Sequence, residues 1–217
     1  MKYGVDAIMA PFTASPDLVT AVKMTEDKLG RGFIMIDTMF LDITDSEDGR
    51  RNARAVIKDS AVRGTKIFAI HHYCVRNLIN GLKGKIERIG DYTVMIREFG
   101  MIPAVGSHIP EVVNLIDENE YDFESYIQIY NCDGFLMQQE IEKCARTIQN
   151  AKKPVMTIKP MASGRLTPYV GLTWAWNTLR PQDMVTVGAF TAAEAEEDIR
   201  ISFSALDHRF PDLPFEL

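Results

Sequence analysis

Seven apolar runs, each closed by polar residues, recur along the chain at intervals of roughly thirty residues, the spacing of strand–helix units. Their continuous apolar character is typical of strands that are buried on both faces of a parallel sheet. The segments between them place apolar residues at helical spacing, which predicts helices. The runs are Asp6–Phe12, Phe33–Asp37, Lys66–Tyr73, Ile102–His108, Tyr126–Asn131, Pro154–Lys159 and Met184–Gly188.

The alternation of strands and helices predicts an α/β fold with a parallel sheet, and the TIM (β/α)8-type barrel is the arrangement that suits it best. Helix boundaries support this interpretation, because Ser15-Pro16 is a helix start and Gly100 is a helix stop. A length of 217 residues lies within the range of α/β barrels that form one unit. No linker or low-complexity stretch divides the chain, so we expect residues 1–217 to form a single domain.

Composition narrows the function classes. The net charge is -6, and no basic stripe collects lysine and arginine, which argues against a nucleic-acid partner. The three cysteines have no paired spacing, which is typical of a reducing compartment. No apolar run approaches the length of a membrane span, and the N-terminus lacks the pattern of a signal peptide. We therefore expect a soluble cytoplasmic protein without a membrane partner.

Several segments, in the same order along the chain, resemble motifs of one enzyme family. Ile158–Thr167 is similar to a YSPLxxGxLT segment, and Val187–Asp198 to an IPGxxxPEQxEEN segment. Gly106–Val113 is similar to GxSNFxPEEL, and Ile70-His71-His72 lies where an IHxP histidine is found. Gln128–Asn131 falls at a QxEYN motif with one residue fewer. Together these segments resemble the aldo-keto reductase superfamily of (β/α)8 barrels over nearly the whole chain.

The resemblance implies a ligand-binding site, but it does not support the family's reaction. It implies that NADP(H) or another anionic small molecule is bound by cofactor-binding residues Ser107, Gln128, Gly188 and Arg165. The family's catalytic tetrad is Asp, Tyr, Lys and His. Here Met9 takes the place of the aspartate, Ile36-Asp37-Thr38 lacks the lysine, and no tyrosine follows at the expected interval, so only His71 is kept. Without the tyrosine and the lysine, carbonyl reduction has no general acid.

The resemblance also implies that the family's first βα unit is missing, because residue 1 falls just before its second strand. A barrel of seven strands has unpaired strand edges. Either another chain, the C-terminal arm or a rearrangement fills the gap, or the given start of the chain is internal. We therefore expect an incomplete barrel with seven parallel strands, and a homo-oligomer if a second copy fills the gap.

The polar strand ends suggest chemistry of their own, since βα proteins place their active sites there. Candidate catalytic residues are Asp37, His71 and Lys159. Lys159 is unusual at the end of an apolar strand, because lysine is seldom buried without a partner. It could anchor a phosphate or carboxylate, or supply an amine for a Schiff base. The alternative is a salt bridge with Asp37 or another acid.

Asp37, His71 and His108 follow three neighbouring predicted strands. One carboxylate and two imidazoles are a plausible ligand set for a divalent metal such as zinc, manganese or iron. Three functions follow. The first is an aldo-keto reductase-like barrel, an oxidoreductase by descent, that binds a nucleotide or anionic small molecule. The second is a metal-dependent lyase, isomerase or hydrolase. The third is a non-catalytic binding or scaffold protein.

Overall fold

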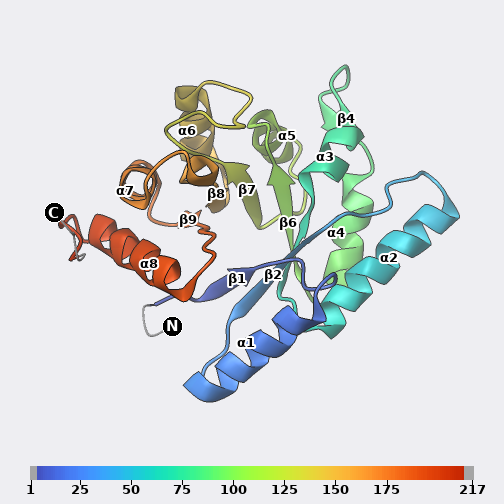
Figure 1. Ribbon diagram of the computed structural model, residues 1–217. Coiled ribbons are helices and arrows are strands. Elements are labelled where there is room, and N and C mark those ends of the chain that lie inside the picture. The colour runs from blue at the N-terminus through green and yellow to red at the C-terminus, as the bar shows by residue number, and fades with distance from the viewer. Residues whose placement is uncertain (1–3, 213–217) are drawn as a thin grey trace. The chain divides into compact units, whose positions relative to one another are not determined.

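The computed structural model describes residues 4–212 of the chain. Strands and helices alternate along most of this length, as Figure 1 shows. Seven strands form one sheet in the order β1-β2-β3-β6-β7-β8-β9, and the strands β4 and β5 form a separate hairpin. The pairs β1–β2, β2–β3, β3–β6 and β8–β9 are parallel. The predicted parallel βα architecture, with seven strands in the main sheet, is confirmed.

The described residues group into two compact units, which we describe separately. The first unit contains residues 6–107 and 112–127, and the second contains residues 4–5, 108–111 and 128–212. The boundary falls within the strand β7, so each unit includes part of the sheet. The expectation of a single domain stays a prediction.

The first unit starts with β1 and ends within β7. Its core includes residues from the sheet and from the covering helices, such as Phe12, Val22 and Phe68, each at most 5% exposed. Its elements are β1 (Ala7–Met9), α1 (Pro16–Leu29), β2 (Ile34–Met39), α2 (Glu47–Val62), β3 (Ile67–Ile70), α3 (His72–Leu78), β4 (Ile79–Asn80), β5 (Lys85–Ile86), α4 (Ile89–Glu98), β6 (Ile102–Ser107), α5 (Glu111–Glu118, whose first residue falls in the second unit) and β7 (Ser125–Ile129).

The second unit contains the C-terminal strands and helices. Its helices α7 and α8 pack against each other. Leu172 and Ala175 of α7 and Ile201 of α8 are buried. Its elements are α6 (Ile141–Asn150), β8 (Val155–Ile158), the short 3-10 helix η1 (Ala162–Gly164), α7 (Pro168–Thr178), β9 (Met184–Val185) and α8 (Ala192–Leu206).

The helix boundaries follow local chemistry. Ser15-Pro16 starts α1 as predicted, and Gly30 ends it in the left-handed conformation with φ 65°, where glycine avoids the strain of a side chain. In α2 the side chain of Ser46 accepts a hydrogen bond from the N–H of Gly49. A β-carbon on Gly49 would lie 2.4 Å from the carbonyl oxygen of Thr44, so only glycine fits there.

Two predicted strands are shorter than their apolar runs. The strand predicted in Lys66–Tyr73 ends at Ile70, because His71 caps the helix α3 instead of extending the strand. The last strand has only Met184 and Val185, whereas the run continues to Gly188. Both strands therefore end earlier than the hydrophobic pattern predicts. β3 is followed by the helix α3, and β9 by an irregular segment.

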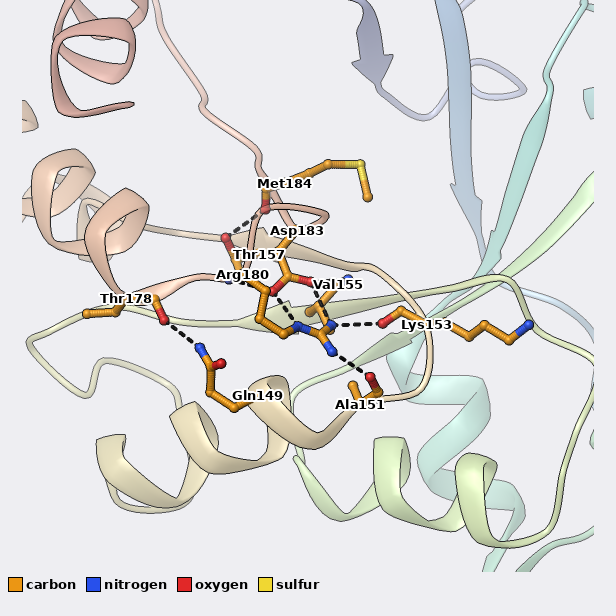
Figure 2. Close-up of polar contacts among 9 residues, drawn as sticks. All are labelled: Gln149, Ala151, Lys153, Val155, Thr157, Thr178, Arg180, Asp183 and Met184. Atoms are coloured by element: carbon orange, nitrogen blue, oxygen red, sulfur yellow. Dashed lines mark hydrogen bonds and ion pairs between the residues drawn. The ribbon is translucent and has the colours of Figure 1, made fainter. Parts of the chain in front are cut away.

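Figure 2 shows how the amino ends of β8 and β9 are held in the second unit. The guanidinium of Arg180 points toward the carboxylate of Asp183, with N–O distances of 2.8 and 2.9 Å. It also donates to the carbonyl oxygens of Ala151 and Lys153. Asp183 in turn accepts a hydrogen bond from the N–H of Val155. This network ties the end of α7 to both strands.

Candidate functional site

His71 connects β3 to α3 in the first unit. Its Nδ1 accepts a hydrogen bond from the backbone N–H of Tyr73 at 3.3 Å, which stabilises the start of the helix. An Nδ1 that accepts is unprotonated, so we assign the proton of the neutral ring to Nε2. Burial, followed by the neighbouring charge of His72, lowers the pKa of His71 from 6.5 to about 4. His71 is therefore a neutral imidazole at physiological pH.

Aromatic rings surround His71. The ring of Phe40, just after β2, lies 3.9 Å from that of His71 between centroids, and the ring of His72 lies 4.1 Å away on the same measure. Tyr73 is 6.1 Å from Phe40. Phe40 and Tyr73 are more than half exposed. The carboxyl ends of β2 and β3 thus present an aromatic surface around a neutral histidine.

Asp37 lies inside the first unit. It is completely buried, and its Oδ1 accepts a hydrogen bond from the N–H of Phe12 at 3.2 Å. Its Oδ2 accepts one from the hydroxyl of Ser60, on α2, at 2.7 Å. Burial raises the pKa of Asp37, and these hydrogen bonds oppose the rise. Both oxygens connect β2 to its neighbours, so the structure gives Asp37 a structural role in place of an open position for catalysis.

The predicted metal ligands are Asp37, His71 and His108. Within residues 4–212 there is no group of three or more His, Cys, Asp or Glu side chains that could hold a metal ion. Asp37 and His71 belong to the first unit and His108 to the second. Both oxygens of Asp37 already accept hydrogen bonds, from Phe12 and Ser60, and the metal site stays a prediction.

Lys159 follows β8 directly in the second unit. Its side chain is half-buried, and its Nζ lies 3.4 Å from the hydroxyl of Ser163. Within the described residues of the second unit no carboxylate pairs with it. Asp37 belongs to the first unit, so the alternative of a salt bridge with Asp37 stays a prediction. The backbone of Lys159 has φ 58°, in the left-handed region that non-glycine residues seldom occupy. The site therefore contains a cation on a strained backbone at a strand end.

Arg165 lies on the segment that links η1 to α7. Its Nε donates to Oδ2 of Asp133 at 2.6 Å, and its guanidinium carbon lies 5.4 Å from the ring centroid of Phe135. Asp133 and Phe135 belong to the segment that follows β7. The ion pair is exposed on the arginine side, where 59% of the side chain is accessible. Arg165 is thus held from one side and open to solvent on the other.

The other predicted cofactor residues differ in exposure. Ser107 is buried at the end of β6. Gln128 is completely buried in β7, and its Oε1 has no hydrogen-bond partner among the described residues. Its Nε2 donates a hydrogen bond to the carbonyl oxygen of Ile129 at 3.2 Å. Gly188 is exposed with open space around it. Of these three, only Gly188 is accessible to a ligand.

The sequence reasoning did not select Ser163, Asp133 or Phe135, which contact the two cations of the second unit. Hydrophobic periodicity carries no signal for them, because they lie in irregular segments. Asp133-Gly134 is a turn dipeptide and was the one available indication.

Comparisons with known proteins support the fold. No family model matches the chain, and no curated protein matches it. Among solved structures, a Pseudomonas aeruginosa protein provisionally named an aldo-keto reductase has a TM-score of 0.66 at 12% identity, over 94% of this chain and 79% of that one. Octameric Rubisco from Pyrococcus horikoshii has a TM-score of 0.66 at 8% identity, over 96% of this chain and 54% of that one. A structure described as native KDPGal has a TM-score of 0.54 at 11% identity, over 95% and 84%.

These identities are too low to carry function, so the comparisons establish the fold alone. The protein has a TIM-barrel-like fold, and its structural neighbours are TIM-barrel proteins of several kinds. In the described residues, no helix combines the length and the apolar character that a membrane crossing requires.

Proposed function

We propose that the protein binds an anionic small molecule at the carboxyl end of β8, with Lys159 as the principal anchor. The observation that supports this proposal best is the isolation of the lysine. Lys159 is partly buried at the end of a strand, and within the described residues its Nζ contacts only the hydroxyl of Ser163. A ligand oxyanion would supply the missing partner.

The backbone around Lys159 supports the same proposal. Lys159, Ala162 and Ser163 all have positive φ, of 58°, 49° and 58°. Each such residue costs of order 1–3 kcal/mol, and strain of this kind persists where surrounding structure maintains a functional site. The segment follows a strand of a parallel sheet, which is the edge where proteins of this fold place their ligand sites.

The ligand class follows from the side chains. An ammonium, a hydroxyl and the guanidinium of Arg165 suit phosphate or carboxylate oxygens. NADP(H) is the candidate that the resemblance to aldo-keto reductases implies. We propose binding and not reduction, because Met9 stands where that family has its aspartate and Ile36-Asp37-Thr38 lacks its lysine.

The test is calorimetric titration of the purified protein with NADPH, pyrophosphate and inorganic phosphate. We expect saturable binding of at least one of them, and a loss of about tenfold or more in Lys159→Met, which corresponds to about 1.4 kcal/mol. Lys58→Met is the matched control, because Lys58 is an exposed lysine of α2 and its loss removes the same charge. Equal affinities in the two variants would refute the anchor role.

His71 supports a second candidate function, the binding of a carbonyl compound in the first unit. Its neutral ring has Nδ1 occupied by Tyr73, so Nε2–H remains as a donor for a carbonyl oxygen. Proton–nitrogen NMR of the histidine rings, recorded while an aromatic aldehyde is added, tests this function. We expect the Nε2 signal of His71 to shift and the signal of His208 to stay. A shift of both signals to the same extent would show non-specific binding only.

A further inference from the structure

The contact between Arg165 and Asp133 leaves part of the guanidinium unused. Asp133 accepts a hydrogen bond from Nε at 2.6 Å, and within residues 4–212 the two terminal nitrogens, Nη1 and Nη2, have no hydrogen bond to protein. A carboxylate that pairs with arginine commonly engages two nitrogens, in a fork geometry. Here Nε of Arg165 is bound to Asp133, while Nη1 and Nη2 remain available to a ligand.

The segment that presents Asp133 is itself fixed. The side chain of Asn131 is completely buried, accepts a hydrogen bond from the N–H of Phe135 at 2.9 Å and donates one to the carbonyl oxygen of Phe135 at 3.1 Å. These two bonds close the turn that contains Asp133 and Gly134. The carboxylate of Asp133 and the ring of Phe135 therefore form two walls of defined position around Arg165.

We infer that Asp133 is a positioning residue, which orients Arg165 so that its two terminal nitrogens hold two oxygens of the anionic ligand. This inference rests on the proposed function and adds a residue that does not touch the ligand. It also assigns the ligand a group with two oxygens on one centre, as in phosphate or carboxylate, because the guanidinium fork matches that geometry.

If Asp133 acted through its charge alone, its removal would raise the affinity for the anionic ligand, whereas removal of a positioning residue should lower that affinity. A carboxylate near a bound anion repels it, so a residue that only competes for Arg165 should weaken binding, and its removal should improve affinity. A positioning residue instead supplies an acceptor for Nε. Asp133→Asn removes the charge and keeps an acceptor oxygen, whereas Asp133→Ala removes both. The two variants have the same net charge and differ in orientation of the arginine.

The experiment is calorimetric titration of wild type, Asp133→Asn and Asp133→Ala with inorganic phosphate and, separately, with acetate. We expect Asp133→Asn to bind at least as tightly as wild type, and Asp133→Ala to bind roughly three- to tenfold more weakly than Asp133→Asn, in keeping with the net contribution of one ordinary hydrogen bond. The anion that shows this difference identifies the ligand group. Equal affinities of the two variants would overturn the inference and leave the proposed function standing. Failure of the wild type to bind any of the tested anions would instead overturn the proposed function.

A second pair of variants keeps the inference testable if Asp133→Ala does not fold. Arg165→Lys keeps the charge but loses the fork, and Arg165→Met loses both. If oriented terminal nitrogens hold the ligand, Arg165→Lys should lose most of the affinity that Arg165→Met loses. Full affinity in Arg165→Lys would show that only the charge matters and would contradict the role of Asp133.

Discussion

Two arginines of the second unit lie beyond opposite ends of the strand β8, and they differ in how completely their donors are used. Arg180, near the amino end, has a side chain only 11% exposed, and its guanidinium donates to Asp183 and to two backbone carbonyl oxygens. Arg165, after the carboxyl end, is 59% exposed and donates to Asp133 through Nε alone.

The difference in exposure and hydrogen bonding indicates that Arg180 stabilises the second unit and that Arg165 is suited to bind a ligand. A buried cation with satisfied donors contributes to the fold, because removal of either partner leaves an uncompensated charge. An exposed cation with free donors contributes little to folding and remains available to a ligand. In barrels of this class the amino ends of the strands serve stability and the carboxyl ends serve function, and the two arginines follow that division.

Replacement of Arg180 should have the largest effect. Arg180→Met leaves Asp183 buried without its cation and frees the carbonyl oxygens of Ala151 and Lys153. We expect a loss of about 3–5 kcal/mol in the free energy of unfolding, measured by urea denaturation. A double variant, Arg180→Met with Asp183→Leu, removes both charges and should recover part of the loss. A loss below about 1 kcal/mol in the single variant would contradict a structural role for Arg180, because a surface ion pair contributes that much.

Asp198 is a buried carboxylate that has no arginine partner among residues 4–212. It lies on α8, is 3% exposed, and burial followed by the charges of Glu197 and Glu194 raises its pKa to about 6. The native state therefore keeps the proton to higher pH than the unfolded chain, so this group lowers stability as pH rises from about 4 to about 6, and the penalty stays in full above that range. We expect Asp198→Asn to stabilise the protein by about 2 kcal/mol at pH 7.5 and by little at pH 4.

The same urea measurements at pH 4, 5.5 and 7.5 check this prediction. Asp183→Asn is the contrast, because Asp183 has Arg180 as its partner and its replacement should destabilise at pH 7.5. A stabilisation by Asp198→Asn that does not change with pH would show that packing, and not ionisation, is responsible.

His71 should produce a smaller effect with the opposite pH dependence. Its folded pKa of about 4 is below the unfolded value of 6.5, so its contribution to stability is present above pH 6.5 and declines as pH falls toward 4. We expect wild type to lose on the order of 1–2 kcal/mol more than His71→Asn between pH 7 and pH 4.5. Asparagine also caps helices well, so the variant keeps the start of α3. NMR titration of the His71 ring should show no protonation at pH 5.5, and a midpoint near 6.5 would contradict the buried neutral state.

Replacement of Arg165 should have the smallest effect on folding. Arg165→Met removes an exposed pair, and we expect a change of less than about 1 kcal/mol in the free energy of unfolding. The same variant should lose affinity for phosphate, so the two measurements separate a binding residue from a structural one. A large loss of stability would show that Arg165, like Arg180, has a structural role.

Much of the fold was predictable because it depends on local pattern. Apolar runs located the seven strands of the sheet, and Ser15-Pro16 and Gly100 located helix boundaries. The hairpin of β4 and β5 was expected only as a loop with glycines, because strands of two residues are too short to show alternation. The end of β3 was misplaced, since the hydrogen bond from Tyr73 to His71 is a side-chain interaction that periodicity does not contain.

The candidate site was predictable in part. Lys159 lies directly after β8, at the strand end where the sequence placed it, and its role as a ligand anchor stays a prediction. Asp37 was selected by the same rule but is occupied by Phe12 and Ser60. Both residues follow apolar runs, so the sequence alone could not separate them.

By itself the sequence determined the order of strands and helices, because the spacing of apolar residues decides which backbone conformation can bury them. It also determined which polar residues stand at strand ends. Only the tertiary structure decided which of those residues are already paired. Partners such as Ser60 for Asp37 and Asp133 for Arg165 lie more than twenty residues away along the chain, and hydrogen bonds over that separation depend on how the elements pack.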